Sequence, residues 1–202
     1  MTIARVTWAV AAHPVQGQTV VGDRGLVTVH PGGILCVVAD GLGHGEEAGR
    51  AAEIAVRSAG EQPGATLIEI MERCHARLQE TRGAAVSLAD WNERARTLSW
   101  LGVGNVEGVA LRAGSPSEAR PPRLLLRGGV VGDNMPPLHP ETLKLADGGL
   151  LVLATDGIAS GFEKEVDLRR DPQAIADWVL SRCSRRTDDA LVLVARLLVK
   201  EL

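Results

Sequence analysis

Residues Cys36 to Gly49 read CVVADGLGHGEEAG, and the rest of the chain can be interpreted outward from this stretch. The apolar run from Leu35 to Ala39 predicts a buried strand, and this strand ends in a carboxylate, Asp40. Three glycines follow, and glycine suits places where the backbone needs close approach or a positive φ. A carboxylate at the mouth of an apolar strand needs a cation or a hydrogen-bond donor. Asp40 is therefore a candidate metal ligand.

The composition is typical of a packed globular protein. The chain has 202 residues, of which 45% are hydrophobic and 23% charged, and its net charge is −3. That charge provides no basic field for nucleic acid, and no apolar run approaches the roughly 20 residues that span a bilayer. Three dispersed cysteines (Cys36, Cys74 and Cys183) favour reduced thiols and a cytoplasmic location. We expect one domain over residues 1–202, without a nucleic-acid or membrane partner.

Hydrophobic periodicity divides the chain into blocks of strands separated by helices. Strands are predicted at 3–12, 26–30, 34–39, 84–91, 97–103, 106–112, 123–127, 150–154 and 190–199. Helices are predicted at Glu46 to Ala59, after the capping box of Thr66 and Glu69, and at Pro172 to Cys183. The tryptophans are expected in the core (Trp8, Trp91, Trp100 and Trp178). This order favours an α+β architecture, with antiparallel sheets and helices outside them.

Acidic residues recur where apolar strands end or begin. They are Asp23, Asp40, Asp156 and Asp188, with Asp189 next to the last. If the strand ends converge, these carboxylates share a small volume, and like charges that close stay ionised only when cations neutralise them. Mg²⁺ and Mn²⁺ prefer oxygen ligands, and the carbonyl of Gly41 can join the carboxylates. Two such ions would suit hydrolysis of a phosphate ester.

Two other interpretations start from the same residues. Gly43 to Ala48 spell G-x-G-x-x-A after a strand and before a helix, which is a dinucleotide-binding fingerprint. Asp40 would repel a pyrophosphate there, and the acid about twenty residues on, Glu61, falls in a turn. Single Asp-Gly pairs are also common turn formers. Nucleotide binding through Gly43 to Ala48 is thus an alternative to a metal site, and these two points count against it.

Three motifs, in this order along the chain, carry a resemblance to a known family. DGLGHG (Asp40 to Gly45), LVLATDG (Leu151 to Gly157) and TDDALVLVAR (Thr187 to Arg196) resemble the metal-dependent Ser/Thr protein phosphatases of type 2C, the PPM superfamily. The most similar branch is the bacterial SpoIIE-like one. Gly22-Asp23 and LGVGNVEGVALR (Leu101 to Arg112) fit the same pattern. The resemblance covers nearly the whole chain and leaves no room for a sensory region, as in the stand-alone phosphatase of the stressosome.

The resemblance implies a four-layer αββα sandwich of two antiparallel sheets flanked by helices, with two Mn²⁺ or Mg²⁺ ions at one end. The implied metal ligands are Asp23, Asp40, Gly41, Asp156 and Asp188, with Asp189 behind them. The implied activity is phosphoserine/phosphothreonine protein phosphatase, in which a metal-activated water hydrolyses phosphorylated STAS-domain proteins of the stressosome. Such an enzyme acts as negative feedback in a bacterial stress response, and we expect a monomer.

The chain also departs from the family pattern beside Asp40. Eukaryotic members read DGHGG, with a histidine two residues after the aspartate, where this chain has Leu42. His44 lies two residues further on, and with Asp23 and Asp40 it completes the candidate catalytic set. His44 can act as the general acid or can be a solvated turn residue. Arg24 is predicted to form a surface salt bridge, and no arginine is assigned to the phosphate. A catalytically silent, partner-binding domain of the same fold is a further alternative.

Overall fold

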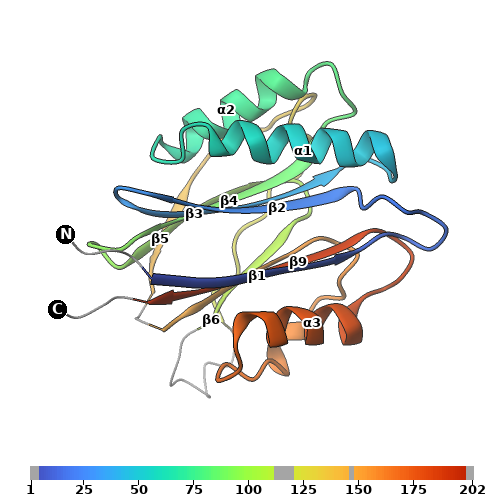
Figure 1. Ribbon diagram of the computed structural model, residues 1–202. Helices are drawn as coiled ribbons and strands as arrows, with labels where there is room; N and C mark the ends of the chain where they lie inside the picture. The colour runs from blue at the N-terminus through green and yellow to red at the C-terminus, as the bar shows by residue number, and fades with distance from the viewer. Residues whose placement is uncertain (1–4, 112–120, 146–147, 199–202) are drawn as a thin grey trace.

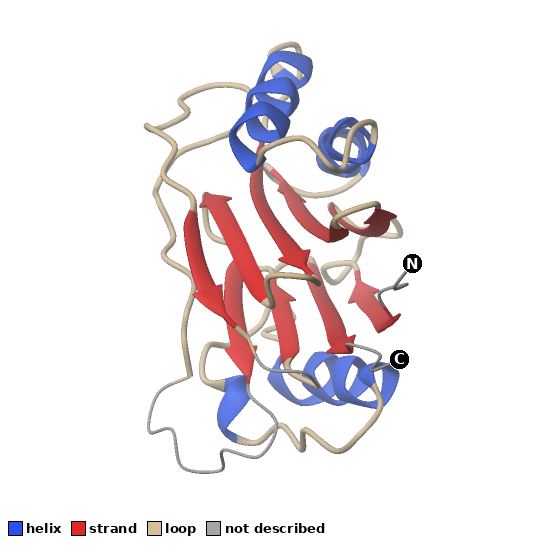
Figure 2. Ribbon diagram, turned by 90° about the vertical axis from the view of Figure 1, so that its left-hand side faces the viewer, coloured by secondary structure: helices blue, strands red, loops and turns tan. Residues whose placement is uncertain are grey.

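Two antiparallel sheets pack face to face (Figures 1 and 2). The computed structural model describes residues 5–111, 121–145 and 148–198. The four-stranded sheet contains, in spatial order, β1 (Arg5–His13), β9 (Ala190–Leu198), β8 (Leu150–Ala154) and β6 (Glu107–Leu111). The five-stranded sheet contains β2 (Asp23–His30), β3 (Gly33–Gly41), β4 (Ala84–Asn92), β5 (Thr97–Val103) and β7 (Glu141–Lys144).

Helices cover the outer face of each sheet, so the molecule has four layers (Figure 1). The helices α1 (Glu46–Gly60) and α2 (Leu67–Leu78) pack on the five-stranded sheet. The helix α3 (Pro172–Cys183) packs on β1 and β9 of the four-stranded sheet, after a short 3-10 helix, Phe162–Lys164. The predicted αββα sandwich of the α+β class is therefore confirmed.

The apolar strands are explained by burial on both faces. In β3, odd-numbered residues pack under the helices, and even-numbered residues pack against the other sheet (Leu35, Val37, Ala39; Ile34, Cys36, Val38). In β9, one set lies between the sheets and the other lies under α3 (Leu191, Leu193, Ala195; Ala190, Val192, Val194). Both strands lie inside their sheets, so neither face needs polar residues.

Most predicted elements are confirmed, including the capping box, in which Thr66 Oγ1 accepts a hydrogen bond from the amide of Glu69. The strand predicted at 123–127 is wrong: Arg123 forms one isolated bridge with Val109, and the residues after it leave the sheet. Strand β7 was not predicted, because it is a short, largely exposed edge strand without an apolar run. Residues 3, 4, 112 and 199, included in predicted strands, lie outside the described residues.

The prediction that all tryptophans are buried is wrong for Trp8. Trp91 and Trp100 are fully buried between the sheets, whereas the side chain of Trp8 is 50% exposed. The reason is topological, because β1 is an edge strand and has no neighbour on its outer side to cover a large side chain. Trp178 packs against the core under α3 while remaining partly accessible.

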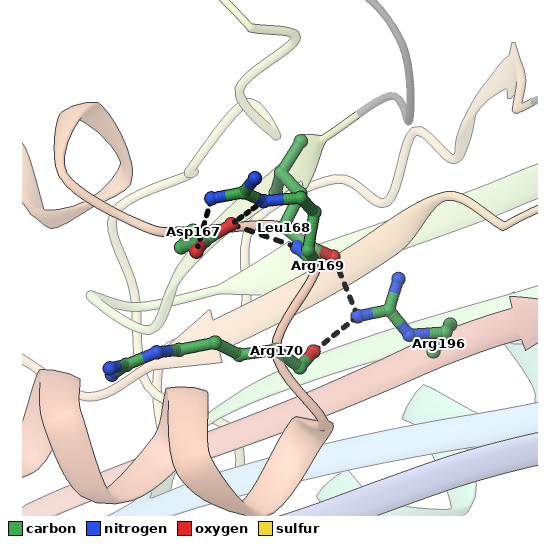
Figure 3. Close-up of polar contacts among 5 residues, drawn as sticks. All are labelled: Asp167, Leu168, Arg169, Arg170 and Arg196. Atoms are coloured by element: carbon green, nitrogen blue, oxygen red, sulfur yellow. Dashed lines mark hydrogen bonds and ion pairs between the residues drawn. The ribbon is translucent and has the colours of Figure 1, made fainter.

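Arg196, near the end of β9, holds the loop that precedes α3 (Figure 3). Its Nη2 donates to the carbonyl oxygens of Leu168 (2.8 Å) and Arg170 (2.5 Å). In the same loop, Asp167 and Arg169 form a bidentate ion pair, whereas the side chain of Arg170 points away from Arg196. The backbone of the loop is thus attached to β9 by the side chain of a single arginine.

Replacing Arg196 by methionine should therefore loosen this loop. The Arg196→Met variant keeps an unbranched apolar stem but loses the hydrogen bonds to the carbonyls of Leu168 and Arg170, so we expect a loss of about 1–2 kcal/mol in the free energy of unfolding. Urea denaturation measures the change. The matched control is Arg170→Met, whose side chain points away from the contact, and it should stay within about 0.5 kcal/mol of the wild type. Equal effects of the two substitutions would contradict this account.

Candidate active site

The predicted acids gather at one end of the sandwich. Asp23 opens β2 and lies opposite Asp40 in the register of β2 and β3. In the other sheet, Asp156 follows the end of β8, and Asp188 precedes β9, its antiparallel neighbour. The two pairs meet, because Thr155 Oγ1 donates to Asp23 Oδ2 at 2.8 Å from one sheet to the other.

Three of these acids line one cavity of about 270 Å³. Asp40, Asp156 and Asp188 form its polar wall, and the remaining lining comes from Leu42, Gly43, His44, Ala85, Asn105 and Thr187. Asp23 lies behind Asp40 and is only 2% exposed. The sequence therefore placed carboxylates from four separate positions in a common volume, as the strand-end argument expected.

Burial, followed by the charges of neighbouring carboxylates, raises the pKa of Asp23, Asp40 and Asp188. Burial is the largest cause of the raised pKa of Asp40, followed by the charges of Asp23, Asp156 and Asp188. Burial also raises the pKa of Asp23, and the hydrogen bond from Thr155 opposes this shift. The pKa of Asp188 is raised by burial as well. The cavity thus holds more negative charge than it can keep ionised without a cation.

Two glycines beside the acids are required by close backbone contacts. A Cβ atom on Gly41 would overlap the carbonyl oxygen of Ala48, so the first turn of α1 can lie directly against the end of β3. A Cβ atom on Gly157 would overlap the carbonyl oxygen of Asp189. Each glycine that follows an acid therefore allows the adjacent segment to approach the cavity.

Asp189 stabilises the loop that leads into Asp23. Its side chain is 3% exposed, and its Oδ1 accepts from the amide of Val15 at 2.8 Å. Its Oδ2 accepts from the amide of Gly22 at 2.9 Å. These contacts are with backbone groups, so Asp189 holds the residue before Asp23 in place while its neighbour Asp188 faces the cavity.

Two polar residues of the site were not identified from the sequence. Asn105 Nδ2 donates to Asp156 Oδ2 at 2.6 Å and orients that carboxylate. Thr155 is buried, and besides donating to Asp23 it accepts from the amide of Leu191 at 2.9 Å. The only available signal was position, because each directly precedes or follows an apolar strand near an acid motif.

Of the two remaining polar candidates, His44 lies at the cavity and Arg24 lies outside it. His44 is exposed and lines the same cavity as Asp188. Arg24 forms a salt bridge with Glu53 at 3.4 Å and donates to the backbone carbonyl of Asp23. The surface salt bridge predicted for Arg24 is confirmed, so its guanidinium is engaged outside the cavity.

The donor set fits a hard divalent cation. Within the described ranges, no three His, Cys, Asp or Glu side chains are already arranged as a metal site. The cavity nevertheless presents carboxylate groups from both sheets, and like charges this close favour a neutralising cation. Oxygen donors of this kind are those that Mg²⁺ and Mn²⁺ prefer.

The fold does not support the dinucleotide fingerprint at Gly43 to Ala48. That motif requires a parallel sheet with the phosphate at the start of the following helix, whereas β3 has antiparallel neighbours on both sides. The first turn of α1 also carries Glu46 and Glu47, which would repel a phosphate.

None of the described helices is long and apolar enough to cross a bilayer.

Comparisons with known proteins agree with this geometry. Residues 30–198 match the family described as Stage II sporulation protein E (SpoIIE). The phosphoserine phosphatase RsbX of Bacillus subtilis (strain 168) is 27% identical over 144 residues, which cover 71% of this chain and 70% of RsbX. A chain from a structural study of the bacterial stressosome, described as adapted to control secondary messenger signalling, is 31% identical and superposes with a TM-score of 0.86. That match covers 95% of this chain and 100% of the other.

A crystal structure of RsbX in complex with magnesium has the same fold. It superposes with a TM-score of 0.81 and 21% identity, and the match covers 98% of this chain and 100% of RsbX. At this identity the likeness concerns the arrangement of sheets and helices.

Without metal, the stability of the protein should depend on pH through Asp40. The folded state holds a proton on Asp40 more strongly than the unfolded state does, so this stabilisation is complete below about pH 4 and is lost as the pH rises toward the raised pKa. In EDTA we expect a lower Tm at about pH 8 than at about pH 5, and a smaller decrease for Asp40→Asn.

Thermal melts at the two pH values measure this difference. The exposed Asp177 of α3 supplies the control, because Asp177→Asn removes a carboxylate far from the cavity and should follow the wild type. An identical pH dependence in the wild type and Asp40→Asn would show that Asp40 is not destabilised by its neighbours.

Proposed function

The chain belongs to the SpoIIE family, and we propose that it is a metal-dependent phosphoserine/phosphothreonine protein phosphatase. The observation that carries the proposal is the convergence of three aspartates, from strand ends far apart in sequence, at one cavity, with the buried Asp23 directly behind them. Such a cavity suits hydrolysis of a phosphate ester, in which negative charge must be neutralised on both the substrate and the attacking water. We propose that residues 1–202 form one domain of this kind.

The metal ligands in this proposal come from both sheets. The proposed ligands of two Mn²⁺ or Mg²⁺ ions are Asp40, the carbonyl of Gly41, Asp156 and Asp188. Asp23 would bind an ion or its water. When bound, such ions lower the pKa of a coordinated water and polarise a phosphoryl oxygen. Asn105 orients Asp156 for this role through its 2.6 Å hydrogen bond.

His44 is the candidate proton donor to the leaving group. It lies on the wall of the same cavity as Asp40, Asp156 and Asp188, and it is exposed, so it can exchange protons with solvent. A serine or threonine oxygen is a poor leaving group unless it is protonated as it departs. The imidazole of His44 would supply that proton near neutral pH.

The substrates proposed for this enzyme are phosphorylated STAS-domain proteins of a stressosome. The support is the similarity to RsbX and to the chain from the stressosome study. In this role the enzyme would act as negative feedback in a bacterial stress response. We further propose that it is a monomer in the cytoplasm, where the free thiols Cys36, Cys74 and Cys183 would stay reduced.

A silent partner-binding domain is the remaining alternative. It predicts that the fold persists while phosphate release is absent with any divalent ion. The acid set argues for activity, because a domain that only binds a partner gains no stability from gathering buried carboxylates beside one another.

Removing the central carboxylate should abolish activity without unfolding the protein. We expect Asp40→Asn to lower Mn²⁺-dependent phosphate release from a phosphoprotein by at least about 10³-fold, because a proposed carboxylate ligand of the ions is lost while the side-chain volume is kept. Malachite-green phosphate assays measure the rate, and circular dichroism checks the fold. The control Asp177→Asn should retain wild-type activity. Full activity of Asp40→Asn, or of the wild type in excess EDTA, would overturn the proposal.

The general-acid role of His44 should depend on the leaving group. We expect His44→Gln to lower kcat for a phosphoserine substrate by about 10²-fold, but to change kcat for p-nitrophenyl phosphate much less, because p-nitrophenolate needs no proton to leave. The exposed His139, outside the cavity, supplies the control variant His139→Gln. If both substrates lose activity equally in His44→Gln, then His44 acts on binding or on the metals and not as an acid.

A further inference from the structure

A second, larger cavity adjoins the carboxylate cavity. It has a volume of about 430 Å³, and Asn105 and Asp156 line both cavities. Its other walls come from Glu107, from residues 123–126, from the turn after β8 and from Arg185. We call this cavity the flanking groove. Because it begins at the side chain of Asp156, any group bound at the carboxylates lies at its mouth.

One wall of the flanking groove is apolar and accessible. Leu125 is 52% exposed and Leu126 is 37% exposed, although the segment that carries them is fixed at both sides. The amide of Leu124 donates to the carbonyl of Gly108 at 3.0 Å, and the carbonyl of Arg127 accepts from the residue that follows β5 at 2.8 Å. Two large apolar side chains on an anchored segment are a feature of binding surfaces.

The flanking groove is also lined by two arginines, Arg123 and Arg185. Arg123 is ion-paired with Glu107 and with Glu163, so its charge is neutralised within the protein. Arg185 is exposed, and within the part of the chain that the structure describes it has no acidic partner. Its backbone is fixed, because the amide of Arg185 donates to the carbonyl of Gly157 at 2.8 Å. The groove thus combines an apolar wall with a free positive charge.

We propose that the flanking groove binds the polypeptide segment next to the phosphorylated residue of a protein substrate. An apolar side chain of that segment would pack on Leu125 and Leu126, and an acidic side chain would pair with Arg185. The proposal deepens the proposed function and rests on it. An extended chain advances about 3.3 Å per residue, so only residues within a few positions of the phosphoserine can reach this groove.

The charge is tested with Arg185→Glu and short phosphoserine peptides in which one glutamate is moved through the flanking positions. We measure kcat/KM for each peptide relative to p-nitrophenyl phosphate, which has no flanking chain. For the best glutamate position, we expect Arg185→Glu to lower this ratio by about tenfold, and replacing that glutamate by lysine to restore it. The matched control is Arg182→Glu, an exposed arginine of α3 outside the groove, which should leave the ratio at the wild-type value.

The apolar wall is tested in the same way with leucine in the peptide. We expect Leu125→Ser to lower the ratio about tenfold for a leucine-containing peptide and not for its serine counterpart. Ile68→Ser, on the exposed face of α2, is the control. The same peptides, labelled with a fluorophore, can also be bound to the Asp40→Asn variant, which should not turn them over. Their affinities, measured by fluorescence anisotropy, should follow the same order as the kcat/KM ratios.

Each other outcome has a defined meaning. If Arg185→Glu and Arg182→Glu behave alike for every peptide, the groove does not bind the flanking segment. If Arg185→Glu lowers the activity on p-nitrophenyl phosphate as much as on the peptides, Arg185 binds the phosphate itself and the proposal is wrong. If the wild type shows no metal-dependent activity on p-nitrophenyl phosphate, it is the proposed function that fails.

Discussion

The repulsion among carboxylates at one end of the sandwich is the constraint on which the rest of the structure depends. Asp40 lies beside Asp23 in the paired strands β2 and β3, and Asp156 and Asp188 approach from the other sheet. Separated in an unfolded chain, these groups would each be ionised and hydrated, so bringing them together costs free energy. The three apolar layers must supply that free energy, and the two strands at the centre of the site are also those buried on both faces. A cation that binds only the folded chain adds to stability by mass action, which links the fold to the chemistry.

Much of the fold and the site could be predicted because the same residues specify both. An apolar run that stops at an acid and a glycine marks the end of a strand and also places a carboxylate there, as at Asp40 and Asp156. These acids then meet because, in an antiparallel sheet, the end of one strand lies beside the start of its neighbour. The errors occurred where burial and pattern disagree. The run at 123–127 is apolar yet mostly exposed, β7 is polar yet a strand, and Trp8 lies on an edge.

The polar residues that were missed have no pattern of their own. Asn105 and Thr155 act through single hydrogen bonds to Asp156 and Asp23, and such contacts join segments 51 and 132 residues apart. A sequence indicates which residue types can make such bonds, but the partner depends on how two sheets pack. Arg185 is a similar case, because the chain contains many arginines and no pattern distinguishes this one. Of the two arginines that line the groove, Arg123 is ion-paired, whereas Arg185 has no acidic partner among the described residues.

Strand β9 connects these parts, because it enters the site at one end and leaves toward the loop before α3 at the other. At its start, Asp188 faces the cavity, while the carboxylate of Asp189 accepts hydrogen bonds from two backbone amides of the loop before β2. Near its end, Arg196 holds two carbonyls of the loop before α3 (Figure 3). A displacement of β9 along its neighbours would therefore move three parts together: a carboxylate of the site, the loop before Asp23 and the loop before α3. Strand β9 is paired with β1 on one side and with β8 on the other, so the carboxylate at its start is held by the sheet. The flanking groove beside it is lined by segments whose backbone is also fixed by hydrogen bonds. Fixed carboxylates for the reaction, next to accessible side chains for the partner, are what a phosphatase acting on protein chains requires.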